Sequence, residues 1–540
     1  MAKKVFYGDE ARAKVLAGAK VLADAVKTTM GPKGRNVVIG KSYGGPNVTH
    51  DGVTVAESID LPETEETLGE KVGAELIKQA AKKMNKAAGD GTTTVTVLTY
   101  EILREANRLI AAGHNPMELR RGVEKAGGEV LAELKNLAEP VDGKHQVIAQ
   151  VASISAGDNE IGQLIADVMT SIGKDGVVSV EPGQGLAMES EIVEGFTFDR
   201  GYTSAYMVTD TNRMEAVYDK PAIIITDKKI SSAQEMLPIL EKLAAAGKKE
   251  VILIAEDVEG EALGVLILNK LKGVLNTVAI KAPSFGDRRK EVLQDIALLT
   301  GATVITSDQG LSFDNVGLEV VGSARKVIAT KDSTTIIEGT GDKNNILGRI
   351  EQIKAQSTAA PSDYDREQYE KRAAALAGKV AVIKIGGATE TEIDEKKYRV
   401  DDAVAAVKAA LLDGIVPGGG VTPINLAAKI KGTDAGAEIL RNALLVPFKQ
   451  LTMNAGLNSE ALLAKVKTAK PGQGINVAKD DGSLIDLKKE GIVDPARVTY
   501  QAIQNAVSIA GTAMTMGALV VDVPEKSTGD MNAGNMPMGY

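Results

Sequence analysis

The chain has 540 residues, a formal net charge of −9, and 44% apolar, 25% charged and 3% aromatic side chains. This composition is typical of a soluble globular protein, and the length predicts about three or four domains. The chain contains no cysteine, no tryptophan and only three histidines. Disulfides, thiolate zinc sites and cysteine nucleophiles are therefore excluded. If the protein performs chemistry, we expect carboxylates and a hard metal ion to carry it.

No stretch of the chain predicts export or a membrane span. Residues 1–20 lack the continuous apolar stretch that a signal peptide has after its charged start. The longest apolar runs, at 222–225, 251–255 and 518–521, are far shorter than a bilayer. The chain is acidic and has no run of Lys and Arg, which excludes a nucleic-acid footprint. We therefore expect a cytoplasmic protein that binds neither membranes nor nucleic acids.

The first 135 residues predict helices. Apolar residues recur at helical spacing over 15–26, and a second helix follows Thr92 and ends at Gly113. In the middle of the chain, short buried strands alternate with helical stretches. The strands are expected at 221–226, 250–257, 276–283 and 302–306, and the helices at 233–245, 259–272 and 288–299. This alternation predicts parallel strands in an α/β layer.

The end of the chain is helical again, at 403–412 and 433–467. An α/β unit therefore lies inside an otherwise helical chain, and the simplest interpretation is an insertion into one domain built from both ends. The tail from Pro524 is rich in Gly, Asn, Met and Pro and has no periodicity. We predict that it is disordered.

Three glycine-bearing segments could contact a ligand. Gly31–Asn36 follows a helix, and Gly89–Thr94 precedes one, where free N–H groups and the helix dipole suit an anion. There, Asp90 could hold Mg²⁺ against a phosphate while the threonine hydroxyls donate to it. The alternative is an ordinary turn with a threonine cap, which explains this pattern in most proteins. Gly418–Gly420 is either a flexible loop or a close approach of a ligand to bare backbone.

The common nucleotide fingerprints are absent. Arg35 stands where a P-loop would need its first glycine, and no strand is followed by G-x-G-x-x-G, which disfavours a dinucleotide oxidoreductase. Asp401 and Asp402 are predicted to begin the helix that runs into Leu411. An Asp in a first turn is usually a cap or a dipole partner. The same dipole would keep it ionised, as a residue that orients or deprotonates water requires.

Two helices of the α/β unit, at 233–245 and 259–272, carry more apolar residues than one buried face needs. Burial on two sides is the ordinary explanation. The alternative is an exposed apolar surface that binds other polypeptides through their apolar side chains.

Eight segments in this order resemble the group I chaperonins, the bacterial sixty-kilodalton heat-shock proteins. The resemblance extends from about residue 4 to about residue 523. Its motifs are GPKGRNVV at 31, DGVTVA at 51, AAGDGTTT at 87, FDRGY at 198, AEDVEGEAL at 255, FGDRRK at 285, GGATETE at 386 and GIVPGGG at 414.

The resemblance implies a multidomain α and α/β fold. A mostly helical equatorial ATP-binding domain would comprise 1–137 and 413–540, a small hinge-like intermediate domain 138–193 and 380–412, and an inserted apical α/β domain 194–379. The family is an ATPase that forms seven-membered rings, two of which stack. It binds unfolded polypeptides at the ring mouth and encloses them under a ten-kilodalton co-chaperonin. ATP and Mg²⁺ are the implied cofactors, and K⁺ stays open as a further ion.

The resemblance also assigns individual residues. Asp402 would position the hydrolytic water, Asp51 would support it, and Asp90 would be the Mg²⁺ ligand. The nucleotide site would consist of Thr29, Met30, Gly31, Pro32, His50, Asp90, Gly91, Thr92, Thr93, Thr94, Gly419, Asn476, Val477, Ala478 and Asp494, with Ile154 and Ser155 nearby. The polypeptide- and lid-binding surface would consist of Tyr202, Tyr206, Met207, Leu237, Leu240, Leu263, Ile267 and Leu268.

The sequence departs from the family in four places. His50 replaces a usual lysine near the phosphates, so a permanent charge is lost unless the histidine is protonated. Residues 61–70 carry an acidic insertion, Met207 replaces a usual aromatic residue, and the tail lacks Gly-Gly-Met repeats. His50 and the altered tail leave open a non-ATPase polypeptide-binding scaffold on the same fold. The periodicity and the glycine loops alone also leave open a monomeric α/β phosphotransferase.

Overall fold

The computed structural model describes residues 2–40, 46–141, 143–173, 176–183, 185–211, 213–360, 362–479 and 481–523. The chain forms two compact units. The first joins Met1–Lys174, Pro182–Ala187 and Ile385–Tyr540, and the second joins Asp175–Glu181 and Met188–Lys384. The α/β segment is thus inserted between two segments that fold together. The predicted disordered tail lies outside the described residues, and the division of the first unit into equatorial and intermediate domains stays a prediction.

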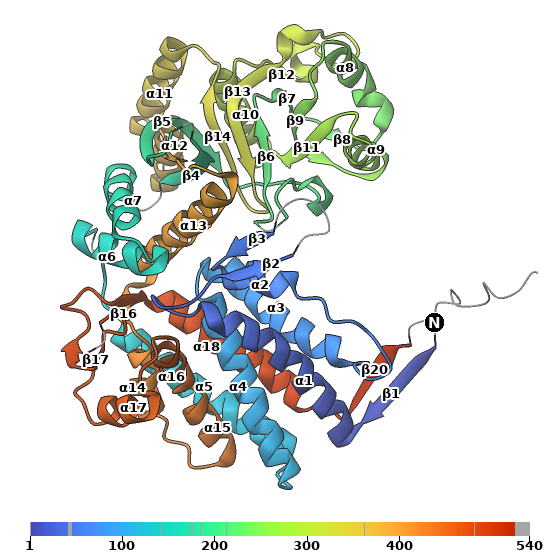
Figure 1. The fold of residues 1–540 in the computed structure, drawn as a ribbon. Helices are drawn as coiled ribbons and strands as arrows, with labels where there is room; N and C mark the ends of the chain where they lie inside the picture. Colours follow the sequence, from blue (N-terminus) through green and yellow to red (C-terminus); the bar gives the residue numbers. More distant parts are fainter. Residues whose placement is uncertain are drawn as a thin grey trace, which may run out of the picture. The chain divides into compact units, whose positions relative to one another are not determined.

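The first unit is mainly helical (Figure 1). Its helices are α1 (Gly8–Val26), η1 (Lys27–Thr29), α2 (Gly52–Ser58), α3 (Glu70–Ala88), α4 (Thr92–Ala111), α5 (Pro116–Leu137), α6 (His145–Ala156), α7 (Asn159–Ile172), α13 (Glu390–Asp413), α14 (Val421–Ala427), α15 (Ala435–Ala443), α16 (Val446–Asn454), α17 (Ser459–Lys467) and α18 (Ala496–Met514). The predicted helix at 433–467 is therefore three helices, because Gly456 turns the backbone at a φ of +74° and Pro447 starts a new first turn.

The core of the first unit lies among α1, α3, α4, α5 and α18, which contribute fully buried side chains such as Leu22, Ile77, Leu98 and Ile503. Helix α4 packs against both α1 and α18 (Figure 1), although α18 lies near the end of the described chain. Two-stranded antiparallel sheets complete the unit: β1 (Lys3–Tyr7) with β20 (Ala518–Asp522), β2 (Val37–Ile39) with β3 (Asn47–Thr49), β16 (Ile415–Pro417) with β19 (Val493–Pro495), and β17 (Gln473–Ile475) with β18 (Leu484–Asp486).

The second unit is built on a mixed sheet of order β11-β9-β7-β13-β14-β5-β15-β4, with β12 beside β7 and β6 beside β13. The strands are β4 (Val177–Pro182), β5 (Glu189–Phe198), β6 (Ala216–Asp219), β7 (Ala222–Thr226), β9 (Glu250–Ala255), β11 (Asn276–Lys281), β12 (Val304–Ile305), β13 (Gly322–Ala329), β14 (Thr334–Gly339) and β15 (Lys379–Ile385). Strands β7, β9, β11 and β12 pair in parallel, which confirms the predicted α/β layer.

Helices accompany this sheet at the predicted places, as α8 (Ala233–Ala245), α9 (Gly260–Leu271) and α10 (Gly286–Thr300). The remaining elements are η2 (Ala205–Met207), β8 (Lys229–Ile230), β10 (Asp257–Val258), η3 (Ser307–Gln309), η4 (Leu318–Val320), α11 (Lys343–Thr358) and α12 (Asp363–Leu376). None of the helices in the described part of the chain combines the length and apolar character needed to span a bilayer.

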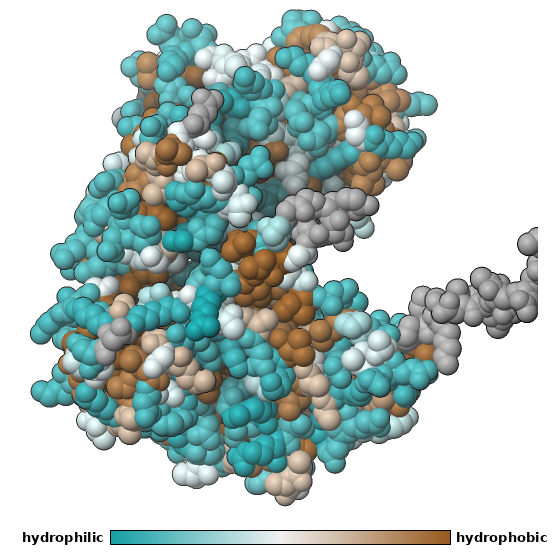
Figure 2. Space-filling view, in the orientation of Figure 1, coloured by the Kyte–Doolittle hydropathy of each residue, from teal (hydrophilic) through white to brown (hydrophobic). Residues whose placement is uncertain are grey.

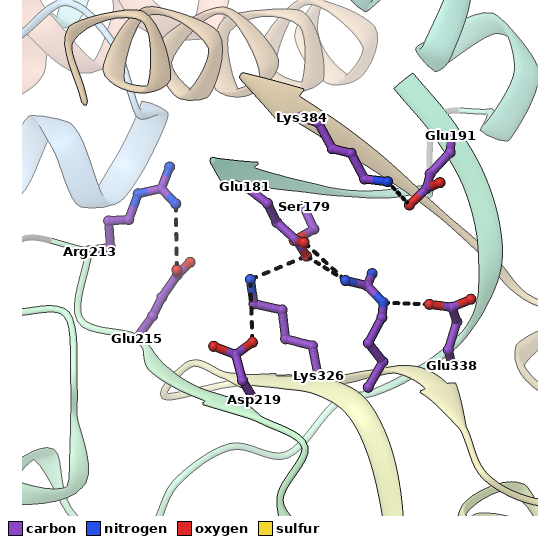
Figure 3. A network of polar contacts seen from close by, with 10 residues as sticks. Ser179, Glu181, Glu191, Arg213, Glu215, Asp219, Lys326, Glu338 and Lys384 are labelled. Atoms are coloured by element: carbon purple, nitrogen blue, oxygen red, sulfur yellow. Dashed lines mark hydrogen bonds and ion pairs between the residues drawn. The ribbon is translucent and has the colours of Figure 1, made fainter. Parts of the chain in front are cut away.

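A carboxylate on β4 ties the last strand of the sheet order to β13 (Figure 3). Both oxygens of Glu181 accept from Arg325 Nη1, at 2.9 and 3.2 Å, and Lys326 Nζ lies 3.2 Å from the same carboxylate. The Glu181 side chain is only 13% exposed. Burial by itself would raise its pKa, but Lys326 and Arg325 together hold the pKa below its usual range. Glu181 is thus a charged tie between two strands that are not neighbours.

Replacing Glu181 with Gln should destabilise the second unit by about 2 kcal/mol, because two cations lose a charged acceptor. Since the folded pKa lies below the unfolded value, this stabilisation is present above about pH 4.5 and is lost as the pH falls through the folded pKa. Differential scanning calorimetry at pH 7 should therefore show a lower melting temperature, and the difference from the unmodified chain should shrink on acidification.

Glu194→Gln is the matched control, since the Glu194 and Lys343 side chains of its ion pair are 61% and 76% exposed and such pairs contribute little. Equal melting temperatures for the two variants would contradict the role of Glu181.

Candidate functional site

The first glycine loop follows α1 and η1 and is closed by its own backbone. The Arg35 N–H donates to the Thr28 carbonyl at 2.8 Å, and the Gly34 N–H donates to the Gly31 carbonyl at 2.9 Å. The side-chain amide of Asn454, at the end of α16, donates to the carbonyls of Lys27 at 3.0 Å and Met30 at 2.9 Å. Asn454 therefore fixes this loop from more than 400 positions away, and no local sequence pattern could have found it.

The second glycine loop connects α3 to α4, and it meets the first. The Thr29 and Thr93 hydroxyl oxygens lie 3.2 Å apart. Helix α2 packs against the start of α4, since a Cβ on Gly52 would lie 2.5 Å from Thr93 Oγ1 and 2.9 Å from Thr92 Oγ1. The first N–H groups of a helix have no partner within the helix. Threonine hydroxyls, free N–H groups and the positive end of α4 thus converge where the two loops touch, as an anion site requires.

Asp90 lies in this loop as a half-buried carboxylate held from both sides. Ser155 Oγ, near the end of α6, donates to Asp90 Oδ2 at 2.8 Å, and the Gly91 N–H donates to Asp90 Oδ1. Burial raises the Asp90 pKa and the Asp51 charge raises it further, while the two hydrogen bonds act in the opposite direction. The pKa of Asp494 is also raised, to about 7, by burial and by the charge of Asp90. The charge of Asp51 thus disfavours ionisation of Asp90, and the charge of Asp90 disfavours ionisation of Asp494.

Asp51 also has a structural role, as the N-terminal cap of α2. Its side chain caps α2, accepting from the Val53 N–H at 3.1 Å, the Thr54 N–H at 2.9 Å and the Thr54 hydroxyl at 2.6 Å. A capping carboxylate is held in one orientation. The charge of Asp51 thus acts on Asp90, and the cap at the start of α2 fixes the orientation of the Asp51 side chain.

These residues fit a magnesium ion that is held partly by a nucleotide. Within the described ranges, no group of three or more His, Asp or Glu side chains is arranged to hold a metal by itself. Mg²⁺ usually takes one or two carboxylates and completes its shell with phosphate oxygens and water. Each Asp90 oxygen has one protein donor and keeps a second lone pair for a cation. Asp90 would hold the ion, with Asp51 and Asp494 adding negative charge nearby.

Asp402 lies elsewhere in its helix than predicted. Helix α13 begins at Glu390, so Asp401 and Asp402 lie in its middle and the expected first-turn position is wrong. Helix α13 contacts the second glycine loop, since a Cβ on Gly89 would lie 2.2 Å from the Ala405 Cβ. Asp402 precedes Ala405 by three residues and so lies on the same side of the helix. It is half-buried on the face directed toward the Asp90 loop.

Gly419, Asp494 and the segment after β17 lie together. Val416 pairs with Asp494 across β16 and β19, and the Gly418 N–H donates to the Ile492 carbonyl at 2.9 Å. A Cβ on Gly419 would lie 3.8 Å from the Ile475 carbonyl oxygen, next to Asn476. The Asn476 side chain accepts from the Ala478 N–H at 3.0 Å, which closes a turn around the buried Val477. The described residues thus bring this predicted set to the same side of the unit as Asp90.

His50 lies against the first loop, since a Cβ on Gly34 would lie 2.9 Å from His50 Cε1. Burial and the charge of Arg399 lower the His50 pKa, so the imidazole is neutral at pH 7. It does not replace the charge of a lysine. Arg399, one turn before Asp402 on α13, is a cation near this site that the sequence analysis did not single out.

The predicted polypeptide-binding residues divide by burial. Tyr202, Met207 and Leu240 are 9%, 0% and 3% exposed, so their expected place on the surface is wrong: they pack in the core of the second unit. Leu237, Leu263 and Ile267 are half-buried. Tyr206 is 72% and Leu268 54% exposed.

Two further exposed side chains near the end of α9, Leu271 at 70% and Val274 at 52%, were not among the predicted site residues. Figure 2 shows apolar side chains gathered over α9. Of the two explanations for the apolar helices, two-sided burial fits α8 and surface exposure fits α9.

Comparison with protein families matches residues 22–524 to the TCP-1/cpn60 chaperonin family. The match covers most of the chain, so the protein belongs to this family. Members act in protein folding as nucleotide-dependent ATPases, bind unfolded proteins and form oligomeric rings.

Replacing Asp494 with Asn should stabilise the nucleotide-free protein in EDTA, and more so at pH 8 than at pH 5. The folded pKa of about 7 lies above the unfolded value of 3.8, so the contribution of Asp494 is most favourable at low pH and is lost as the pH rises toward 7. The largest gain is about 4 kcal/mol. Urea denaturation at both pH values measures it.

The exposed Asp394 of α13 supplies a control, and Asp394→Asn should change stability equally at both pH values. A gain for Asp494→Asn that does not depend on pH would contradict the raised pKa.

Proposed function

We propose that this protein is an ATP-dependent group I chaperonin that binds unfolded polypeptides at the mouth of a ring and promotes their folding. The observation that carries the proposal is the meeting of two glycine loops beside three interacting carboxylates. The Thr29–Thr93 contact of 3.2 Å and the effect of the Asp90 charge on the pKa of Asp494 support it. A phosphate with a divalent cation satisfies both the donors and the carboxylates.

The residues divide into three tasks in this proposal. The start of α4, with Thr92, Thr93 and Thr94, and the loop from Thr29 to Pro32 bind the phosphates. Gly419, the Asn476–Ala478 turn and Asp494 bind the nucleoside. When bound, Mg²⁺ neutralises the charge that develops on the phosphates.

Asp402 completes the site in this proposal by orienting the attacking water and accepting its proton. Phosphoryl transfer depends on positioning and charge neutralisation more than on a strong base. A carboxylate therefore suffices, in a chain without cysteine and with only three histidines.

The ranges 1–137 with 413–540, 138–193 with 380–412, and 194–379 serve as equatorial, intermediate and apical domains. The contact between Gly89 and Ala405 supports coupling of α13 to the nucleotide loop. A shift of α13 would move Asp402 relative to Asp90. Hydrolysis and domain motion would then share one helix.

The apical part binds unfolded polypeptide and a ten-kilodalton co-chaperonin through the exposed side chains of α9 and Tyr206. One such surface binds weakly, but seven copies in a ring raise the effective concentration. The exposure of Leu268 and Leu271 supports this task, since apolar contacts select for apolar segments rather than for one sequence.

A non-ATPase polypeptide-binding scaffold is the second candidate. The neutral His50 favours it, because a cation usual for the family is lost near the phosphates. Mg²⁺-dependent release of phosphate from ATP by the purified protein would eliminate this candidate.

Asp402→Ala should lower ATP turnover at least about 100-fold, the usual effect of removing a general base, and should leave nucleotide affinity within about threefold. A phosphate-release assay and isothermal titration with a non-hydrolysable analogue measure the two quantities. Asp394→Ala, an exposed change on the same helix, is the control. Unchanged turnover in Asp402→Ala would refute the assigned role.

Light scattering and particle images with ATP should show rings, and added ten-kilodalton co-chaperonin should cap their ends. Leu268→Ser should preserve the rings and weaken capping, because it removes an exposed apolar contact. A monomer in the presence of ATP and co-chaperonin would contradict the proposed assembly.

A further inference from the structure

Lys270, in the last turn of α9, lies near the surface, but its ammonium is bound to the backbone of another segment. Its ammonium donates to two backbone carbonyl oxygens, those of Met207 and of Val208, the second at 2.9 Å. Burial lowers the Lys270 pKa, and the charge of Glu250 acts in the opposite direction. The side chain thus gives up hydration to join α9 to the segment that contains η2.

The η2 segment is also held by the sheet on which it packs. Met207 is fully buried, and its sulfur accepts from the Ala279 N–H at 3.2 Å, while Thr203 Oγ1 lies 3.8 Å from it. The neighbouring Tyr206 is 72% exposed. Met207 therefore holds η2 onto the sheet and Lys270 holds it onto α9, while the Tyr206 side chain is exposed to solvent.

Half-buried and exposed apolar side chains of α9 lie next to this junction. Leu263, Ile267 and Leu271 recur every four residues and form one stripe along the helix. Lys270 follows Ile267 by three residues, so its side chain emerges beside the stripe. The segment that it binds therefore borders the apolar surface seen over α9 in Figure 2.

The positive charge of Lys270 is opposed by Glu250, which belongs to a network of hydrogen-bonded side chains. Glu250 accepts from Asn276 Nδ2 at 2.8 Å, and Asn276 Oδ1 accepts from the hydroxyl of the buried Tyr218 at 3.2 Å. Glu250 is thereby oriented within the unit, and its charge opposes the loss of the Lys270 proton. An apolar side chain of equal length would leave the two carbonyls without this donor and Glu250 without this nearby positive charge.

We propose that Lys270 is a positioning residue for polypeptide binding: its ammonium fixes η2 against α9, so that Tyr206 and the apolar stripe form one pre-organised surface. The proposal rests on the proposed function, since it assumes that this surface binds unfolded polypeptide. A surface that is ordered before binding avoids the entropy cost of ordering it on contact. Loss of the ammonium should therefore weaken binding without removing any apolar contact.

The test compares Lys270→Met, Lys270→Arg and Lys272→Met in the full-length protein. The probe is fluorescently labelled, reduced and carboxymethylated α-lactalbumin, which stays unfolded, and anisotropy gives its dissociation constant. Lys270→Met should raise that constant about tenfold, whereas Lys270→Arg should stay within about threefold because a guanidinium can donate to both carbonyls. Lys272→Met removes one exposed charge two positions along the chain and should leave binding unchanged.

A second readout separates positioning from misfolding. In Lys270→Met, amide hydrogen exchange should rise at residues 205–208 while the exchange of β9 and β11 and the melting temperature stay near those of the unmodified chain. Unchanged binding or unchanged exchange in Lys270→Met would overturn the proposal, and so would an equal loss in Lys272→Met. If the unmodified chain does not bind the probe, the proposed function fails first, and this proposal fails with it.

Discussion

The candidate site of the first unit is built around one electrostatic constraint: the charge of Asp51 acts on Asp90, and the charge of Asp90 acts on Asp494. Burial and neighbouring charge raise the pKa of Asp90 and of Asp494, so the nucleotide-free site carries an electrostatic cost. Each carboxylate is nevertheless held in place: Asp51 by capping α2, Asp90 by Ser155 and Gly91, and Asp494 by its position in β19. In the proposed function, a site that keeps like charges together by fixed hydrogen bonds would bind a cation without further rearrangement, because the cost of assembling it is met in folding.

The second glycine loop, between α3 and α4, also contacts α13. Gly89 admits the Ala405 side chain at a distance that leaves no room for a Cβ, and it turns the backbone at a φ of +68°. Any other residue would separate the helix from the loop and strain the turn. Since α13 also carries Asp402 and Arg399, this close contact constrains the distance of both side chains from the second glycine loop. Ser155 adds a second tie from α6. The electrostatics of the site are therefore coupled to the placement of two helices rather than to the loops alone.

Local patterns predicted the elements that make the scaffold but not the contacts that complete the site. Buried strands such as 250–255 are continuous apolar runs flanked by helices, so periodicity located them and their parallel pairing. The start of α13 was missed because residues 390–402 are dominated by charged side chains and show no apolar stripe, which placed Asp402 in the wrong turn. Asn454 and Ser155 act on residues far away in the chain, and nothing in their own neighbourhoods indicates a partner. The burial of Met207 and Leu240 likewise depends on what packs above them.

In two separate parts of the chain, a side chain from another helix donates to the backbone carbonyls of a short 3₁₀ turn. Both η1, before the first glycine loop, and η2, beside α9, are single 3₁₀ turns, so each closes on one carbonyl of its own and leaves others for partners outside the turn. In each case a side chain from another helix supplies the donors: Asn454 for Lys27 and Met30, and Lys270 for Met207 and Val208. An unsatisfied, partly buried carbonyl is costly, so each donor holds its turn in one place. The donors differ with their surroundings: Asn454 supplies a neutral amide to the first glycine loop, and Lys270 supplies an ammonium where Glu250 offers a counter-charge.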